Sequence, residues 1–326
     1  MNKLKKIGLT ALAASLATVS AHAVDITASG GASISYTSNG NVGASATGNP
    51  WSMSDTVNFS GSGEMDNGWT VTMTMGLDSS AVAAGAGFED RAISIDMGDA
   101  GAINFAGTDG SGPVGAWDDK MPSANEESWA NAAGTKSTIA SAAIGDNAFT
   151  YTNSTMMDGL AIELFYLPSN DGETTDAGGA EANSSFQYGA TYTGIDGLTI
   201  GYAGGDNEDS LTNTIENTIL YAKYTMDSFT FGYQTNEEDE ESTNADTDFT
   251  AWGISYAVSD ELSISLGMSE TEHENTSLVD QEAEAISFSY VSGGMTIGGS
   301  MHNVDNVAGA EATDNSGYEL NVTFAF

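Results

Sequence analysis

The chain has 326 residues, of which 46 are Asp or Glu and only seven are Lys or Arg, so its formal net charge is −39 at pH 7. Such a chain lacks the basic surface that nucleic acids require, and its charge disfavours docking onto an anionic membrane surface. It has no cysteine, which excludes a disulfide framework and any metal site built on thiolates.

Residues 1–23 have the three parts of a secretory signal peptide. The basic stretch MNKLKK precedes the apolar run IGLTALAASLATVS, which is shorter than the ~20 apolar residues of a membrane-spanning helix. Ala21 and Ala23 then fit the A-x-A cleavage pattern. We predict export through the Sec pathway, cleavage after Ala23 and a mature domain of residues 24–326. Its basic residues are Arg91, Lys120, Lys136 and Lys223.

Beyond residue 23, apolar residues recur at every second position in sixteen segments. A period of two predicts strands with one apolar face and one polar or small face. The expected strands are 24–36, 51–61, 69–77, 93–97, 103–107, 149–151, 160–166, 186–192, 198–202, 220–226, 229–233, 252–258, 262–268, 286–290, 295–301 and 318–326.

The connectors between these strands alternate in length. Several short ones carry Asp, Asn and Gly, which suit tight turns because Asn and Gly accept positive φ. The short connectors are 65–69, 98–101, 153–159, 194–197, 226–228, 259–261 and 292–294. The long connectors fall near 38–50, 79–90, 108–147, 168–184, 204–217, 235–247, 269–283 and 303–317.

This alternation is typical of an outer-membrane barrel, in which turns are short on the periplasmic side and loops are long outside. We therefore predict an all-β, 16-stranded antiparallel transmembrane β-barrel with its apolar face toward lipid and its polar face toward the lumen. Glu163, between Ile162 and Leu164, is expected to face water. Aromatic residues near strand ends are expected to form the two interfacial girdles: Tyr36, Trp51, Trp69, Tyr166, Tyr192 and Tyr256.

The chain ends within a strand, YELNVTFAF, and not in a polar tail. Its apolar face consists of Tyr318, Leu320, Val322, Phe324 and Phe326. Unpaired strand edges have no water to bond with in a membrane, so a barrel must be closed. We therefore expect this last strand to pair with the first.

The chain resembles a general bacterial porin of the alphaproteobacterial type. The resemblance covers the mature chain and is carried by the signal sequence, the opening VDITASGGASISY, the hairpin RAISIDMGDAGAINFAG at 91–107 and the ending NVTFAF. It implies an outer-membrane channel, not an enzyme, that forms a homotrimer in outer-membrane lipid. It further implies that the third loop, 108–147, folds inward, and that the barrel assembly machinery reads the C-terminal strand.

The resemblance also implies that charged residues line the constriction beside this loop. The candidate acids are Asp109, Asp118, Asp119, Glu126 and Glu127, and the candidate bases are Lys120, Lys136, Arg91 and Lys223. The arginine cluster of related porins is missing. Arg91 matches the family arginine at the start of the fourth strand but shares the parity of lipid-facing Ile93, so either a bulge re-aims it or it lies at the aqueous rim. Lys223 has the inward parity.

Rings of Asp and Glu favour cations, so we predict a water-filled, cation-preferring channel for passive diffusion of small hydrophilic solutes and ions, without a cofactor. Two alternatives stay open. A sugar-specific channel on the same barrel is one, because Trp117 and Trp129 lie in the long loop. A non-channel, exported β-rich surface protein is the other.

An acidic run is a weak candidate for loop-bound calcium, since carboxylates suit this ion. It consists of Glu237, Glu238, Asp239, Glu240 and Glu241 and lacks the spacing of an EF-hand. The simpler interpretation is a solvated loop.

Overall fold

The computed structural model describes residues 26–40, 49–78, 90–117, 119–125, 127, 144–168, 184–210, 213–241 and 245–326. The predicted signal peptide with Ala21 and Ala23 lies outside the described residues, as do Asp118, Glu126, Trp129 and Lys136. Within the described ranges, no helix is long and apolar enough to cross a membrane.

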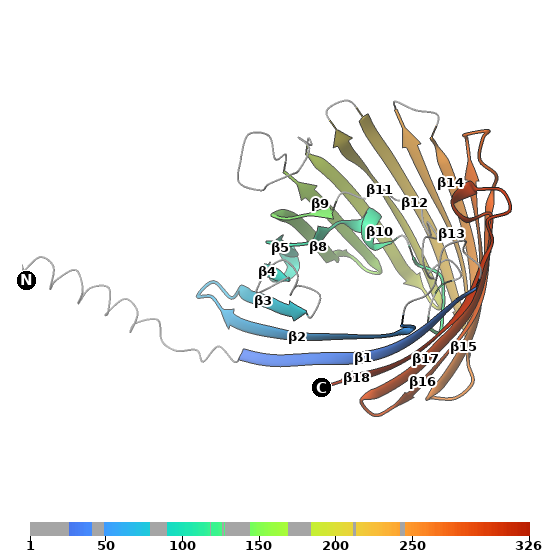
Figure 1. Cartoon of the computed structure of the whole chain (residues 1–326). Coiled ribbons are helices and arrows are strands. Elements are labelled where there is room, and N and C mark those ends of the chain that lie inside the picture. The colour runs from blue at the N-terminus through green and yellow to red at the C-terminus, as the bar shows by residue number, and fades with distance from the viewer. Residues whose placement is uncertain are drawn as a thin grey trace, which may run out of the picture.

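Sixteen strands in the described part of the chain form one closed antiparallel barrel (Figure 1), which confirms the predicted fold class. Each strand pairs with its neighbours in chain order. The barrel strands are β1 (Ile26–Gly40), β2 (Trp51–Glu64), β3 (Thr70–Asp78), β4 (Arg91–Asp96), β5 (Ala102–Ala106), β8 (Ala148–Met157), β9 (Leu160–Leu167), β10 (Ser185–Ile195), β11 (Leu198–Ser210), β12 (Asn213–Met226), β13 (Phe229–Glu240), β14 (Thr247–Ala257), β15 (Leu262–His273), β16 (Gln281–Ser292), β17 (Met295–Asp305) and β18 (Asn315–Ala325).

The first and last strands of the described chain close the barrel. β1 pairs with β18 over ten residue pairs, from Gly31 opposite Ala325 to Gly40 opposite Ser316. Phe326 extends this ladder, because its N–H donates to the Gly30 carbonyl at 2.9 Å and its carbonyl accepts from the Gly30 N–H at 2.8 Å. The predicted pairing of the last strand with the first is therefore confirmed, and the terminal phenylalanine belongs to the wall.

Exposure alternates along the strands as the period of two predicts. On β16, Ala285 and Ser287 are buried on the inner face, whereas Ile286 is 63% exposed on the outer face. Aromatic rings gather on the outer face at both ends of the barrel. Tyr36 lies 5.0 Å from Trp51 near the loop end, and Phe229 lies 4.5 Å from Tyr256 near the turn end, measured between ring centroids. This is the distribution of an interfacial girdle.

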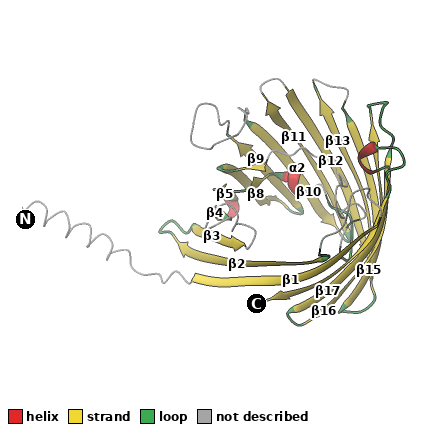
Figure 2. Cartoon of the chain, in the orientation of Figure 1, coloured by secondary structure: helices red, strands yellow, loops and turns green. Residues whose placement is uncertain are grey.

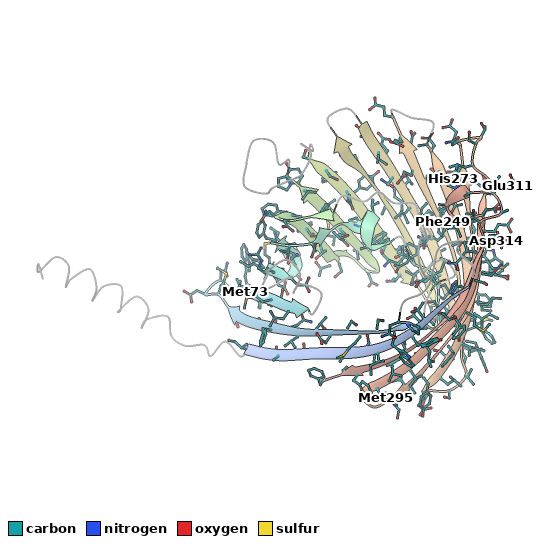
Figure 3. All side chains as sticks on the ribbon, in the orientation of Figure 1. Met73, Phe249, His273, Met295, Glu311 and Asp314 are labelled. Carbon is teal, nitrogen blue, oxygen red and sulfur yellow. The ribbon has the colours of Figure 1, made fainter. Side chains whose placement is uncertain are left out.

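The turns follow the sequence prediction, but several strands run further than predicted. Gly159 and Gly197 adopt positive φ in tight turns. The expected loop at 204–217 is instead largely strand, because β11 continues to Ser210 and β12 begins at Asn213. Backbone pairing continues beyond the apolar band, where the residues of β11 after Gly205 are polar and show no alternation. In Figure 3, His273, Glu311 and Asp314 mark the end of the barrel that carries the long loops, and Met295 lies toward the end that carries the short turns.

Candidate functional site

The long loop after β5 enters the barrel. Its two ends are joined by a short ladder between β6 (Gly110–Ser111) and β7 (Ile144–Gly145). The helix α2 (Pro113–Ala116) follows, with Pro at its first position, where a missing N–H costs nothing. Figure 2 shows α2 inside the ring of strands, next to β10. For its described residues, this confirms the inward fold of the third loop.

The described residues 113–117 and 119–125, which we call the luminal segment, pack on the inner wall of the barrel. Its first half buries Val114 and Trp117 in an apolar cluster with wall residues of β11 and β12: Ala203, Ile219 and Tyr221. Its second half buries Met121 against Phe249 and Ala251 of β14. Because Val114, Trp117 and Met121 are all 9% exposed or less, the segment is seated on the wall and does not extend freely into the lumen.

Four charged side chains from the loop and the wall are linked by pairwise electrostatic interactions. Lys223 of β12 interacts with Lys120 and Asp119 of the luminal segment, and Lys120 interacts with Glu163 of β9. The Lys120 ammonium donates to the Ala116 carbonyl at 2.6 Å. The Lys223 ammonium lies 5.8 Å from the centroid of the Tyr221 ring, within cation–π range.

Of these four side chains, Glu163 borders a cavity of about 720 Å³ on the turn side of the luminal segment. Its wall includes Trp117 and the acids Asp96, Asp99 and Glu163. Glu163 therefore faces the lumen, as its parity predicted. The sequence did not single out Asp96 or Asp99, although the inward parity of Asp96 on β4 was readable.

The other candidate residues lie in different places. Asp119 is exposed on the luminal segment. Asp109 begins the loop, where its N–H donates to the Asp146 carboxylate at 3.2 Å. Glu127 accepts a hydrogen bond from the Ser123 hydroxyl at 3.2 Å. The structure does not bring Asp109 into the charged group around Lys120 and Lys223.

Arg91 lies on the outer face at the loop end of β4. The ladders of β4 with β3 and β5 show no register shift, so no bulge re-aims it. A Cβ placed on outward-facing Gly107 would lie 3.5 Å from the Arg91 Cβ. Its guanidinium donates to the Gly107 carbonyl at 3.5 Å. Of the two sequence interpretations, the geometry fits the aqueous rim, and Arg91 is not among the side chains brought together in the lumen.

The structure offers little support for two other sequence hypotheses, the sugar-specific channel and calcium binding by the acidic run. Trp117 is 9% exposed and its ring packs edge-on against Tyr221 at 5.6 Å, so little of its ring is open to a sugar. Of the acidic run, Glu237 to Glu240 lie in β13, whose alternation sends Glu237 and Asp239 to one face and Glu238 and Glu240 to the other. Among the described residues, no three His, Asp or Glu side chains are grouped as metal ligands.

The wall residues that hold the luminal segment were not among the site residues predicted from the sequence. The Gln187 amide oxygen accepts from the Val114 N–H at 3.1 Å, and Gln234 bonds the backbone on both sides of Asp119. Large amides at inward positions of predicted strands were the available signal, because a buried amide requires a partner.

A closed sixteen-stranded barrel with an apolar outer band, a polar inner wall and a loop seated inside defines the class of outer-membrane diffusion channels. The chain matches the family model of Gram-negative porins over residues 8–290, and it belongs to this family. It is an outer-membrane porin, and both family and fold point to a channel and not to an enzyme.

Solved porins share this fold at low sequence identity. The anion-selective porin from Comamonas acidovorans is 12% identical, with a TM-score of 0.69 over 93% of this chain and 99% of that one. A trimer form of OmpT, an outer-membrane protein of Vibrio cholerae, is 13% identical, with a TM-score of 0.68 over 93% and 99%. No curated protein sequence matches the chain.

Proposed function

We propose that the protein is a passive diffusion pore for small hydrophilic solutes and ions, and that it prefers cations. The observation that carries this proposal is the seating of the luminal segment on the inner wall of a closed sixteen-stranded barrel. A ring of about 16 strands encloses a water-filled channel. A loop seated inside it narrows that channel.

The charge distribution supports the cation preference. Only four bases follow the predicted signal peptide, and all 46 acids do. Acidic side chains along a narrow aqueous path attract cations and repel anions. Lys120 and Lys223 oppose this effect locally, so the constriction is less cation-preferring than the net charge alone implies. The Comamonas porin is named as anion-selective, but at 12% identity the two chains share a fold and not a set of luminal charges.

We also propose a homotrimer whose contact face includes the shortest strands. β4 has six residues and β5 has five, whereas a tilted strand needs about 9–11 residues to cross a bilayer. A wall this short is better covered by another copy than by lipid. The trimer form of the similar Vibrio cholerae protein is consistent with this assembly.

The proposed function is tested with purified protein in planar bilayers. We expect discrete conductance steps and, across a tenfold KCl gradient, a reversal potential of the sign that marks cation preference. Liposome swelling with sugars of increasing size is expected to show an upper size limit and no saturation. Anion preference would refute the charge argument, and saturable flux of one sugar class would favour the solute-specific alternative. A folded protein that conducts no current would refute the pore.

A further inference from the structure

Polar side chains on the inner wall, from β10 to β18, form hydrogen bonds with the luminal segment along its length. We call this row of wall residues the track. It begins at Gln187 on β10, as described above, and passes Gln234 on β13. Farther along, the Ala124 N–H donates to the Ser265 hydroxyl of β15 at 2.8 Å. At the far end, Asn321 of β18 donates to the Asn125 side-chain oxygen at 3.1 Å. The wall therefore holds the segment at intervals along its length.

Glycines on the inner wall leave space for the luminal segment. Four inward positions of the described wall that face the segment lack a side chain: Gly189, Gly232, Gly253 and Gly298. A Cβ on Gly189 would lie 2.8 Å from both Pro113 and Trp117 atoms, and one on Gly253 would lie 3.1 Å from the Pro122 carbonyl oxygen. On Gly232 it would overlap Pro122, and on Gly298 it would overlap Asn125. None of the four has positive φ, so the requirement is for space and not for backbone conformation.

Gln234 bonds the segment through both ends of its side-chain amide. Its oxygen accepts from the Lys120 N–H at 2.7 Å, and its nitrogen donates to the Trp117 carbonyl at 2.9 Å. The same nitrogen donates to the Asn236 side chain at 2.8 Å, which fixes the amide orientation. Gln234 is fully buried, so no water competes for these bonds.

The two Gln234 bonds, to Trp117 and Lys120, lie on either side of Asp119 and so fix the charged part of the segment. Lys120 is held at its backbone by Gln234 and at its ammonium by the Ala116 carbonyl. Any rotation of the segment away from the wall would break both Gln234 bonds and move Lys120 relative to Lys223 and Glu163. The position of one residue on β13 is thus coupled to both the width and the charge of the constriction.

We propose that Gln234 is a positioning residue for permeation: it fastens the luminal segment into the glycine-lined track and thereby fixes the aperture and the place of Lys120 within it. This inference rests on the proposed pore function. A loop held by the wall alone, without a covalent link, has a docking equilibrium that single substitutions can shift.

The first test compares Gln234→Ala with Thr230→Ala. Thr230 is an inward residue of the same strand, four positions before Gln234, whose hydroxyl lies 3.0 Å from that of Thr225. Each buried hydrogen bond lost is expected to shift the docking equilibrium roughly two- to tenfold. Gln234→Ala is therefore expected to give a noisier current, a higher solute size limit and a changed reversal potential, with an unaltered heat-modifiable gel mobility. Thr230→Ala is expected to behave as the parent.

The second test ties the segment to the wall. The Met121 Cβ lies 3.6 Å from a Cβ built on Gly253, within the ~3.5–4.5 Å range of disulfides, and the chain has no other cysteine to compete. Met121→Cys with Gly253→Cys is expected to form a disulfide in the folded barrel. In the Gln234→Ala background this disulfide is expected to restore the quiet current, and dithiothreitol to abolish the restoration.

The proposal is overturned if Gln234→Ala and Thr230→Ala give the same currents, or if the disulfide forms and does not restore the Gln234→Ala channel. Failure of the cysteine pair to form a disulfide in folded protein would contradict the position of the segment itself. Disulfide formation is read by thiol titration and needs no current, so it separates this inference from the proposed function, which fails if the parent protein does not conduct.

Discussion

Neutralising Lys223 tests how the constriction selects ions. Lys223 is half-buried on the inner wall of β12 and lies within electrostatic range of Lys120 and Asp119. Lys223→Gln retains a polar side chain of similar reach and removes one of the few positive charges of the lumen. We expect a higher ratio of cation to anion permeability.

The size of the effect follows from Coulomb's law. An ion passing about 8 Å from the ammonium interacts with it by about 0.5 kcal/mol in bulk water and about 2 kcal/mol at an effective dielectric of ~20. Screening over a Debye length of about 10 Å in ~0.1 M salt reduces these values by roughly half. Because the change favours cations and disfavours anions, the permeability ratio changes by twice the remaining energy, or about two- to twentyfold.

The assay is the reversal potential in asymmetric KCl, measured for the parent, Lys223→Gln, Lys120→Gln and Arg91→Gln. The two lysine variants are expected to move in the cation-preferring direction. Arg91 lies on the outer face, so its variant is the matched control and should not move. An equal shift for Arg91→Gln, or no shift for either lysine, would show that the luminal charges were assigned wrongly.

Three further predictions concern the wall. Glu282 has a carboxylate directly opposite on each neighbouring strand. Glu282→Gln is therefore expected to raise the free energy of unfolding by about 0.2–1 kcal/mol and to make Tm depend less on NaCl. Glu284 faces no opposite acid, so Glu284→Gln should have neither effect. Deleting Phe326 removes two backbone hydrogen bonds with Gly30. We expect this deletion to lower the free energy of unfolding, measured in urea with detergent-solubilised protein, by about 1–3 kcal/mol. Phe326→Leu keeps both backbone bonds and should retain most of this stability. Ile93→Arg on the short-strand face is expected to abolish the trimer on unboiled gels and Ile200→Arg on β11 to leave it intact; a persistent Ile93→Arg trimer would place the contact face elsewhere.

The sequence predicted the wall well, because each strand crossing the membrane must alternate and each turn must be tight. Both constraints leave a local pattern, as at Gly197 or along Ile286 and Phe288. Prediction failed where pairing continues outside the apolar band. Along β11, residues beyond Gly204 are polar on both faces, so the hydrogen-bonded hairpin with β12 looked like a loop.

The constriction was only partly predictable. The inward parity of Glu163 and Lys223 was readable on their own strands. The contact of Lys120 with Gln234, by contrast, joins residues 114 positions apart. It depends on how a loop of irregular backbone crosses several strands, and no local periodicity encodes that path. The inward glycines of the track were visible in the sequence, but a missing side chain gains meaning only when the group filling its space is known.

The central claim is that neighbouring residues on one strand face water inside and lipid outside. Glu163→Cys and Leu164→Cys on β9 test it directly, because Glu163 borders the luminal cavity and Leu164 is exposed on the outer face. A charged, water-soluble methanethiosulfonate reagent is added to single open channels of each variant. We expect a stepwise change of current for Glu163→Cys and none for Leu164→Cys. The same response from both positions, or a response from Leu164→Cys alone, would contradict the account.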